Sequence, residues 1–153
     1  MHQVGIGVLG PVFRTYDPES DRLVAVKAFS LDFLPEQAEI FVEALKKIVD
    51  VGFSHPTIVT PLDAGLEEGI PFLATEYVTA ESLDVAVHHG EPVPVDQMLM
   101  LVGQLAAAVD AAHARGVMHG GLHARDVFVA PEITRVNGFG VASALEHVGL
   151  KVP

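Results

Sequence analysis

A glycine-rich turn near the N-terminus contains the first residues of the sequence that could bind a phosphate group. Gly5, Gly7 and Gly10 match the pattern G-x-G-x-x-G. In a dinucleotide-binding fold a helix would follow this pattern, but here the strand formers of Pro11–Tyr16 follow it. The turn is therefore predicted to join two strands. Because glycine has no Cβ, its backbone N–H groups could approach phosphate oxygens closely. A flexible hairpin tip is the alternative interpretation.

A lysine at the end of an apolar run is the second candidate. Lys27 follows the β-branched run Val24–Val26, where its ammonium group requires water or an anion. If the glycine turn covers phosphates, Lys27 on the neighbouring strand could reach their oxygens. The alternative is a surface lysine whose alkyl chain is buried and whose charge reaches solvent.

Two histidines have a spacing that would suit a metal ion on a helix. His119 and His123 are four residues apart, which places two ring nitrogens on one helical face. They lie in a glycine-rich stretch, however, so His119 is interpreted as a packed structural residue. No metal site is predicted from these histidines.

The elements that must position these residues follow from the hydrophobic pattern. The first half of the chain predicts a small antiparallel sheet with one helix, and the second half predicts a long helix followed by short apolar segments. The expected strands are Val4–Gly10, Pro11–Tyr16, Leu23–Phe29, Ile58–Leu66 and Phe72–Val78; the expected helices are Pro35–Val51, ended by Gly52, and Val95–Arg115, ended by Gly116.

The composition predicts a folded domain and excludes several classes of protein. Of the 153 residues, 50% are hydrophobic and 19% are charged, below the usual ~25%. Acidic residues outnumber basic ones by 20 to 9, for a net charge of −11. A nucleic-acid groove needs clustered Lys and Arg, so no nucleic-acid partner is expected. The lack of cysteine excludes disulfide scaffolds and thiolate metal sites, and fits a reducing compartment.

A membrane partner is not expected either. No positively charged region precedes the first apolar residues, so no secretory signal is predicted. The most apolar stretch, Met98–Val109, is interrupted by Gly103 and Gln104 and is too short to cross roughly 30 Å of hydrocarbon. A cytoplasmic protein is therefore expected.

Several motifs in this order resemble those of protein kinases. Gly5–Phe13 with Val24–Lys27 resembles the glycine-rich loop and the lysine of strand three. Further matches are Ser54–Val59, similar to the stretch after the αC helix, Phe72–Val78, similar to strand five and the hinge, and Leu105–His119, similar to the αE helix of bacterial Ser/Thr kinases. The resemblance implies an α+β kinase-like fold. Residues 1–78 would form the N-lobe, with an antiparallel sheet and αC, and 79–153 the first part of the helical C-lobe.

The resemblance also implies that the catalytic residues are degenerate. Against the family pattern H-R-D-L-K-P-x-N, the chain starts with His119 and has Gly121 at the catalytic aspartate, His123 at the lysine and Asp126 at the asparagine. Gly138 replaces the aspartate of D-F-G. Asp126 is a possible metal ligand, and Mg²⁺ binding is expected to be weak or absent. The expectation is a pseudokinase that binds ATP and acts in regulation or scaffolding. An active divergent Ser/Thr kinase and a nucleotide-free interaction module are the alternatives.

The family resemblance assigns further residues to the nucleotide. For adenine it implies a roof of Val12 and Ala25, a floor of Phe128, a back wall of Thr75, and hydrogen bonds from the backbones of Glu76 and Val78. The αC carboxylate expected to pair with Lys27 is Glu43, although counting along the helix also points to Ala44 or Lys46, and Glu39 is a further option.

The sequence reaches Pro153 shortly after Gly140, before the rest of the family's activation segment and its αF helix. We therefore expect part of the apolar surface of the Val95–Arg115 helix to face a partner, through self-association or packing against another protein. A truncated gene or an isolated fragment would explain the early stop equally well.

Overall fold

The computed structural model describes residues 1–7, 9–88 and 92–151. Its larger sheet has five antiparallel strands in the order β1-β2-β3-β5-β4. The strands are β1 (His2–Gly7), β2 (Gly10–Asp17), β3 (Arg22–Ala28), β4 (Pro61–Glu67) and β5 (Ile70–Glu76). The predicted strands exist, and their ends differ from the predicted ones by one to three residues. Ile58, predicted to begin a strand, instead forms an isolated parallel bridge with Val136.

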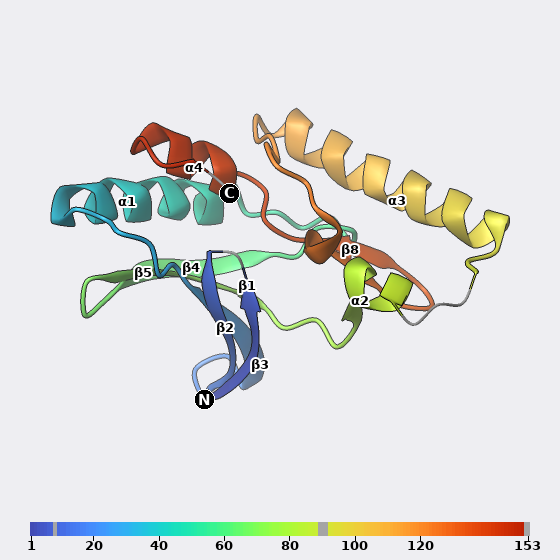
Figure 1. Ribbon diagram of the computed structural model, residues 1–153, viewed down its shortest axis with the longest axis horizontal. Helices are drawn as coiled ribbons and strands as arrows, with labels where there is room; N and C mark the ends of the chain where they lie inside the picture. Colours follow the sequence, from blue (N-terminus) through green and yellow to red (C-terminus); the bar gives the residue numbers. More distant parts are fainter. Residues whose placement is uncertain (8, 89–91, 152–153) are drawn as a thin grey trace.

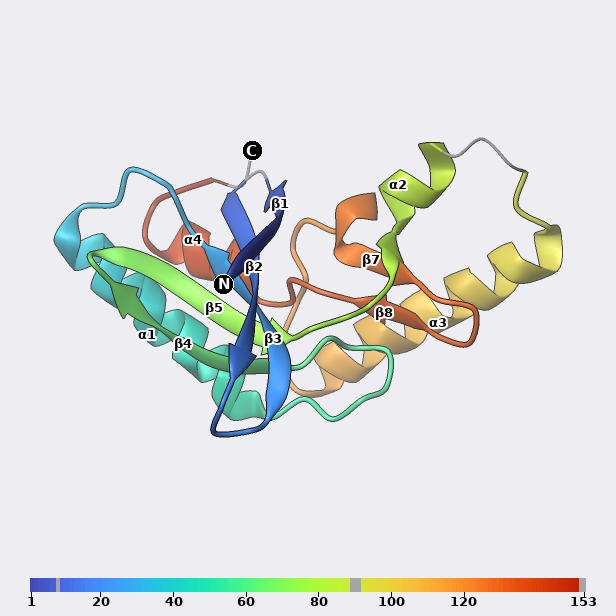
Figure 2. The same ribbon diagram turned by 90° about the horizontal axis from the view of Figure 1, so that it is seen from below.

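A second part of the chain follows β5 and is mainly helical (Figure 1). It contains β6 (Glu81–Ser82), α2 (Leu83–His88), α3 (Val95–Ala114), the 3-10 turn η1 (Ala124–Asp126), β7 (Val127–Val129), β8 (Thr134–Val136) and α4 (Val141–His147). Strands β6, β7 and β8 form a small antiparallel sheet. The long helix α3 extends away from the larger sheet in both views (Figures 1 and 2).

Helix α1 (Pro35–Val51) has the predicted bounds. Pro35 occupies the first turn, where its missing N–H costs nothing, and the side chain of Gln37 accepts a hydrogen bond from the Leu34 amide at 2.9 Å. Gly52 ends the helix with a left-handed φ of 66°, which glycine adopts without strain. The apolar face of the helix is buried against the sheet through Ala38, Phe41, Val42, Leu45 and Ile48.

The core joins the two parts of the chain through α1 and α4. Phe41, Leu45 and Leu145 are all fully buried in one hydrophobic cluster. Figure 1 shows α1 and α4 side by side above the sheet, and the Gln37 side chain donates a hydrogen bond to the Val148 carbonyl at 3.0 Å. The sequence pattern did not predict α4, whose seven residues are too short for a clear helical period.

Helix α3 is exposed over its N-terminal half. Only Ala108 and Ala112 of its residues are buried, whereas Val95 is 74% and Leu99 68% exposed. By length and composition, this single helix could also cross a bilayer, which by itself is weak support for a membrane span. The expectation that its apolar stretch is too short for a membrane is corrected in this respect, because the helix extends to 20 residues.

We predict that the exposed face of α3 drives self-association. Replacing Leu99 and Val102 by Gln removes apolar area that water disfavours, so sedimentation velocity should show a larger monomer fraction than in the unmodified chain. Val87→Gln is the matched control, since Val87 is 60% exposed on a different helix. A well-folded monomer of the unmodified chain that binds no hydrophobic dye would contradict the prediction.

Candidate functional site

The glycine-rich turn closes the hairpin between β1 and β2, in which Gly7 and Gly10 are paired. A Cβ on Gly10 would collide with the carbonyl oxygen of Ala28, and its φ is +141°. The fold itself therefore requires glycine at this position. A Cβ on Gly7 would point into the space beside Lys27, 3.8 Å from its Cε, whereas Gly5 has open space around it. Gly7 is thus the glycine that keeps the approach to Lys27 open.

Lys27 lies in the middle of the larger sheet. It is on β3, with Val12 of β2 on one side and Leu73 of β5 on the other. Burial lowers the pKa of its ammonium group below the ordinary value of 10.5; the carboxylate of Asp126 opposes this shift and the charge of Arg125 adds to it. Its Nζ lies 5.9 Å from the centre of the Phe29 ring.

The expected partner of Lys27 on α1 is not beside it. Glu43 is exposed and lies 3.9 Å from Lys46, one turn along the same helix. Together with Glu39 and Val42, these two residues line a hollow of about 320 Å³ between α1 and β4. In the described part of the chain, Lys27 forms no ion pair within 4.0 Å. The assignment of Glu43 is therefore corrected: the helix turns this carboxylate toward solvent.

Ala44 and Ile48 line the opposite side of α1. With Gly140 and Ser143 they border a hollow of about 300 Å³ between α1, α4 and the end of α3. A Cβ on Gly140 would lie 2.8 Å from Ile48, so this glycine lets the chain pass close to α1. Of the positions considered from the sequence, Ala44 faces the interior, and it has no charge to offer Lys27.

His119 is a buried structural residue. Its Nε2 lies 2.8 Å from the Asn137 carbonyl oxygen, which makes Nε2 the donor and Nδ1 the nitrogen without a partner. The ring packs edge-on against Phe139 at 5.0 Å. His123 is exposed and caps η1, since its Nδ1 accepts from the Arg125 amide at 3.1 Å. Among residues 1–7, 9–88 and 92–151, no three His, Cys, Asp or Glu gather as a metal site.

Asp126 is the carboxylate at the degenerate loop. Its Oδ2 accepts from the His123 amide at 3.0 Å and lies 3.7 Å from Nε2 of His119. A Cβ on Gly138 would be 3.6 Å from Oδ1 of Asp126, and Gly138 has a φ of +93°. Asp126 thus borders the space that a side chain at Gly138 would enter. Gly121 is exposed, and a Cβ at this position would meet open space.

The residues assigned to adenine lie on the strands around the end of β5. Ala25 pairs with Thr75, and Phe128 on β7 pairs with Ser82. Thr75 is buried, and its hydroxyl donates to the Glu76 carbonyl at 3.1 Å. Val12, Val78 and Phe128 are half-buried. Their role as an adenine pocket stays a prediction.

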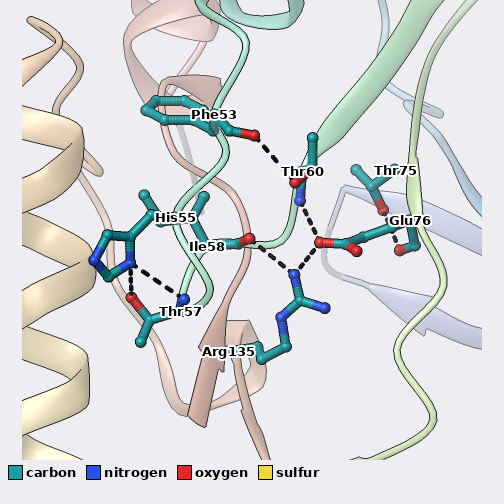
Figure 3. Close-up of polar contacts among 8 residues, drawn as sticks. All are labelled: Phe53, His55, Thr57, Ile58, Thr60, Thr75, Glu76 and Arg135. Atoms are coloured by element: carbon teal, nitrogen blue, oxygen red, sulfur yellow. Dashed lines mark hydrogen bonds and ion pairs between the residues drawn. The ribbon is translucent and has the colours of Figure 1, made fainter. Parts of the chain in front are cut away.

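Sequence reasoning missed the partner of the Glu76 side chain. Figure 3 shows Arg135 of β8 paired with this carboxylate. The two residues are far apart in the sequence, and the one signal for Arg135 is a charged residue inside the short β-prone run Ile133–Val136.

Three comparisons with known proteins agree. The family described as "Protein kinase domain" matches residues 1–151. A probable serine/threonine-protein kinase PknB of Lactococcus lactis is 28% identical over 150 residues, and serine/threonine-protein kinase PknK of Mycobacterium tuberculosis is 31% identical over 147. These matches cover 97% and 93% of this chain. The crystal structure of the M. tuberculosis PknI kinase domain superimposes with a TM-score of 0.78 at 24% identity, over 99% of this chain. This similarity confirms the predicted α+β fold class.

The chain is shorter than each of these relatives. It spans 24% of the Lactococcus protein, 13% of PknK and 65% of the PknI chain.

Lys27 gives a prediction with a defined pH dependence. Below its lowered pKa the ammonium is charged in both folded and unfolded chains, and the folded state bears the full cost of burial. Between that pKa and 10.5 the unfolded chain binds more protons, so the free energy of unfolding should rise with pH in this window. Lys27→Met should therefore be more stable than the unmodified chain near neutral pH, by a margin that narrows toward about pH 10.

Urea unfolding at several pH values measures this margin. Lys47→Met is the control, because Lys47 is exposed on α1 and its removal should give a margin that does not vary in the same way. Parallel stability curves for Lys27→Met and the unmodified chain would contradict the prediction.

Proposed function

Because the chain belongs to the protein kinase family, we propose that it binds ATP between the β1–β2 hairpin and β3 and has lost efficient phosphotransfer. In this proposal it is a pseudokinase module with a regulatory or scaffolding role in the cytoplasm. One observation carries the proposal: Lys27 lies beneath Gly7 without a carboxylate partner in the described residues, while glycine occupies both positions where the family has its catalytic aspartates.

Electrostatics support ATP as the ligand. A half-buried ammonium without a counterion is costly, and the phosphates of ATP would supply that counterion. Arg125 is close enough to Lys27 to influence its pKa, so a second cation is available near the same space. Gly7 leaves room for an approach that a side chain would narrow. These residues fit a polyphosphate.

The residues present do not fit Mg²⁺ equally well. Protein kinases use ATP with Mg²⁺, which two protein ligands hold against the phosphates. Here Gly138 supplies no ligand, and Asp126 alone remains, already bonded to the His123 amide. We therefore derive no step that depends on the metal, and we propose that ATP binding is nearly independent of Mg²⁺.

Loss of phosphotransfer follows from Gly121. A glycine cannot accept a proton or orient a substrate hydroxyl, and loss of a general base typically costs about 10²- to 10⁴-fold in rate. Nothing near Gly121 demands a glycine, since a side chain there would meet open space. The missing aspartate is thus a change in chemistry that packing does not require.

Asp126 supports a second candidate function, an active but divergent Ser/Thr kinase. Its carboxylate lies within the degenerate loop and is one-quarter exposed, so it could take over part of the role of the missing aspartates. The exposed face of α3 supports the third possibility, a protein-interaction module that binds no nucleotide.

A thermal shift with ATP tests the proposed function. ATP at about 100 times its Kd should stabilise the chain by about 2.7 kcal/mol, and Lys27→Met should abolish the shift. Transfer of labelled phosphate to a generic protein substrate should be absent. Lack of any shift in the unmodified chain would favour the interaction module, whereas transfer that depends on Lys27 and Asp126 would favour the divergent kinase.

Gly138→Asp should make nucleotide binding sensitive to Mg²⁺, because the new carboxylate would lie beside Asp126. Aspartate is among the residues that tolerate positive φ. Gly138→Asn carries a side chain of similar size and backbone strain without the charge, and is the matched control. The ATP-induced thermal shift is expected to grow with Mg²⁺ only in Gly138→Asp. An unmodified chain that already requires Mg²⁺ for its shift would contradict this prediction.

A further inference from the structure

A salt bridge joins the end of β5 to the small sheet. The carboxylate of Glu76 pairs with the guanidinium of Arg135 on β8 (Figure 3). The two side chains are 25% and 22% exposed, so both charges are mostly withdrawn from water. Removing one partner from such a pair leaves the other charge uncompensated, which is more disruptive than losing a surface contact.

The same two side chains also hold the connection between α1 and β4. Oε1 of Glu76 accepts from the Thr60 amide at 2.8 Å, and the Glu76 amide donates to the Thr60 carbonyl at 3.1 Å. Nη2 of Arg135 donates to the Ile58 carbonyl at 3.0 Å. One arginine therefore links three segments of the chain, namely β8, the α1–β4 connection and the end of β5.

Strand β8 is itself fixed to that connection by its backbone. The Val59 amide donates to the Val136 carbonyl at 2.9 Å, and the Val136 amide donates to the Thr57 carbonyl at 2.8 Å. The chain then continues to Asn137, whose carbonyl accepts from His119. Arg135 thus holds the end of β5 to a support that is continuous with the degenerate loop.

We propose that Arg135 is a positioning residue for the adenine-binding edge; this inference rests on the proposed ATP site. Residues 77–79 after Glu76 have no regular secondary structure, so no strand partner fixes the backbone of Val78. The Arg135–Glu76 pair supplies that restraint from the side-chain direction. A binding edge that is already ordered loses less conformational freedom when the ligand arrives, and so binds more tightly.

The geometry requires arginine in particular. Its planar fork presents several N–H donors at once, and here one terminal nitrogen serves both the Glu76 carboxylate and the Ile58 carbonyl. A lysine could keep the charge and the fold but would hold this pair of acceptors in a less defined geometry. Arg135→Lys therefore separates positioning from charge.

The test compares ATP with inorganic triphosphate, which carries the phosphates without adenine. Arg135→Lys and Glu76→Gln should weaken ATP binding by about tenfold, as expected when ~1.4 kcal/mol is lost, and should leave triphosphate binding unchanged. A purely structural role would change both ligands alike or neither. Arg115→Met is the matched control: Arg115 also donates to a backbone carbonyl, that of Val51, but at the far end of α1.

Amide hydrogen exchange in the nucleotide-free chain provides the second measurement. The amides of Thr60 and Glu76 should exchange at least about tenfold faster in Arg135→Lys, and Arg115→Met should leave them unchanged. If the unmodified chain binds no ATP, the proposed function fails while the exchange result still decides whether Arg135 orders this edge. Unchanged exchange, or equal loss of ATP and triphosphate binding, would overturn the inference. Should either variant fail to fold, the other carries the same comparison.

Discussion

The burial of one positive charge in the middle of a sheet is the constraint on which the proposed site depends. Lys27 is placed between β2 and β5 by strand pairing that also builds the core of the larger sheet, so its backbone position is not adjustable. Its ammonium group then needs an anion. Helix α1 turns Glu43 outward and places Ala44 toward the interior, and Asp126 is the carboxylate that opposes the cost of burial. A bound polyphosphate would meet the remaining need.

The glycines of the site differ in what they contribute. Gly10 and Gly138 adopt positive φ, and Gly10 also lies against the Ala28 carbonyl, so the fold has its own reasons for small residues there. Gly121 has no such reason, because it is exposed with open space beside it. Loss of the catalytic aspartate at Gly121 is therefore a chemical difference from the family, independent of how the chain packs.

Much of the fold could be predicted because it depends on local signals. The bounds of α1 follow from Pro35, Gly52 and a regular apolar face, and the hairpin of β1 and β2 follows from glycines between strand formers. The features that were missed depend on contacts between distant segments. No local pattern shows that α4 docks on α1, that Glu43 faces solvent, or that Arg135 meets Glu76, because helix rotation and side-chain pairing are decided by tertiary packing.

The docking of α4 limits how α1 can move. Leu145 is fully buried beside α1, and Gln37 reaches across to the Val148 carbonyl. Any rotation of α1 that would carry Glu43 inward toward Lys27 must first break this contact and expose Leu145 to water. The orientation of α1 is therefore coupled to the integrity of the core, and a switch between two helix orientations would need partial unfolding of the segment that follows Gly140.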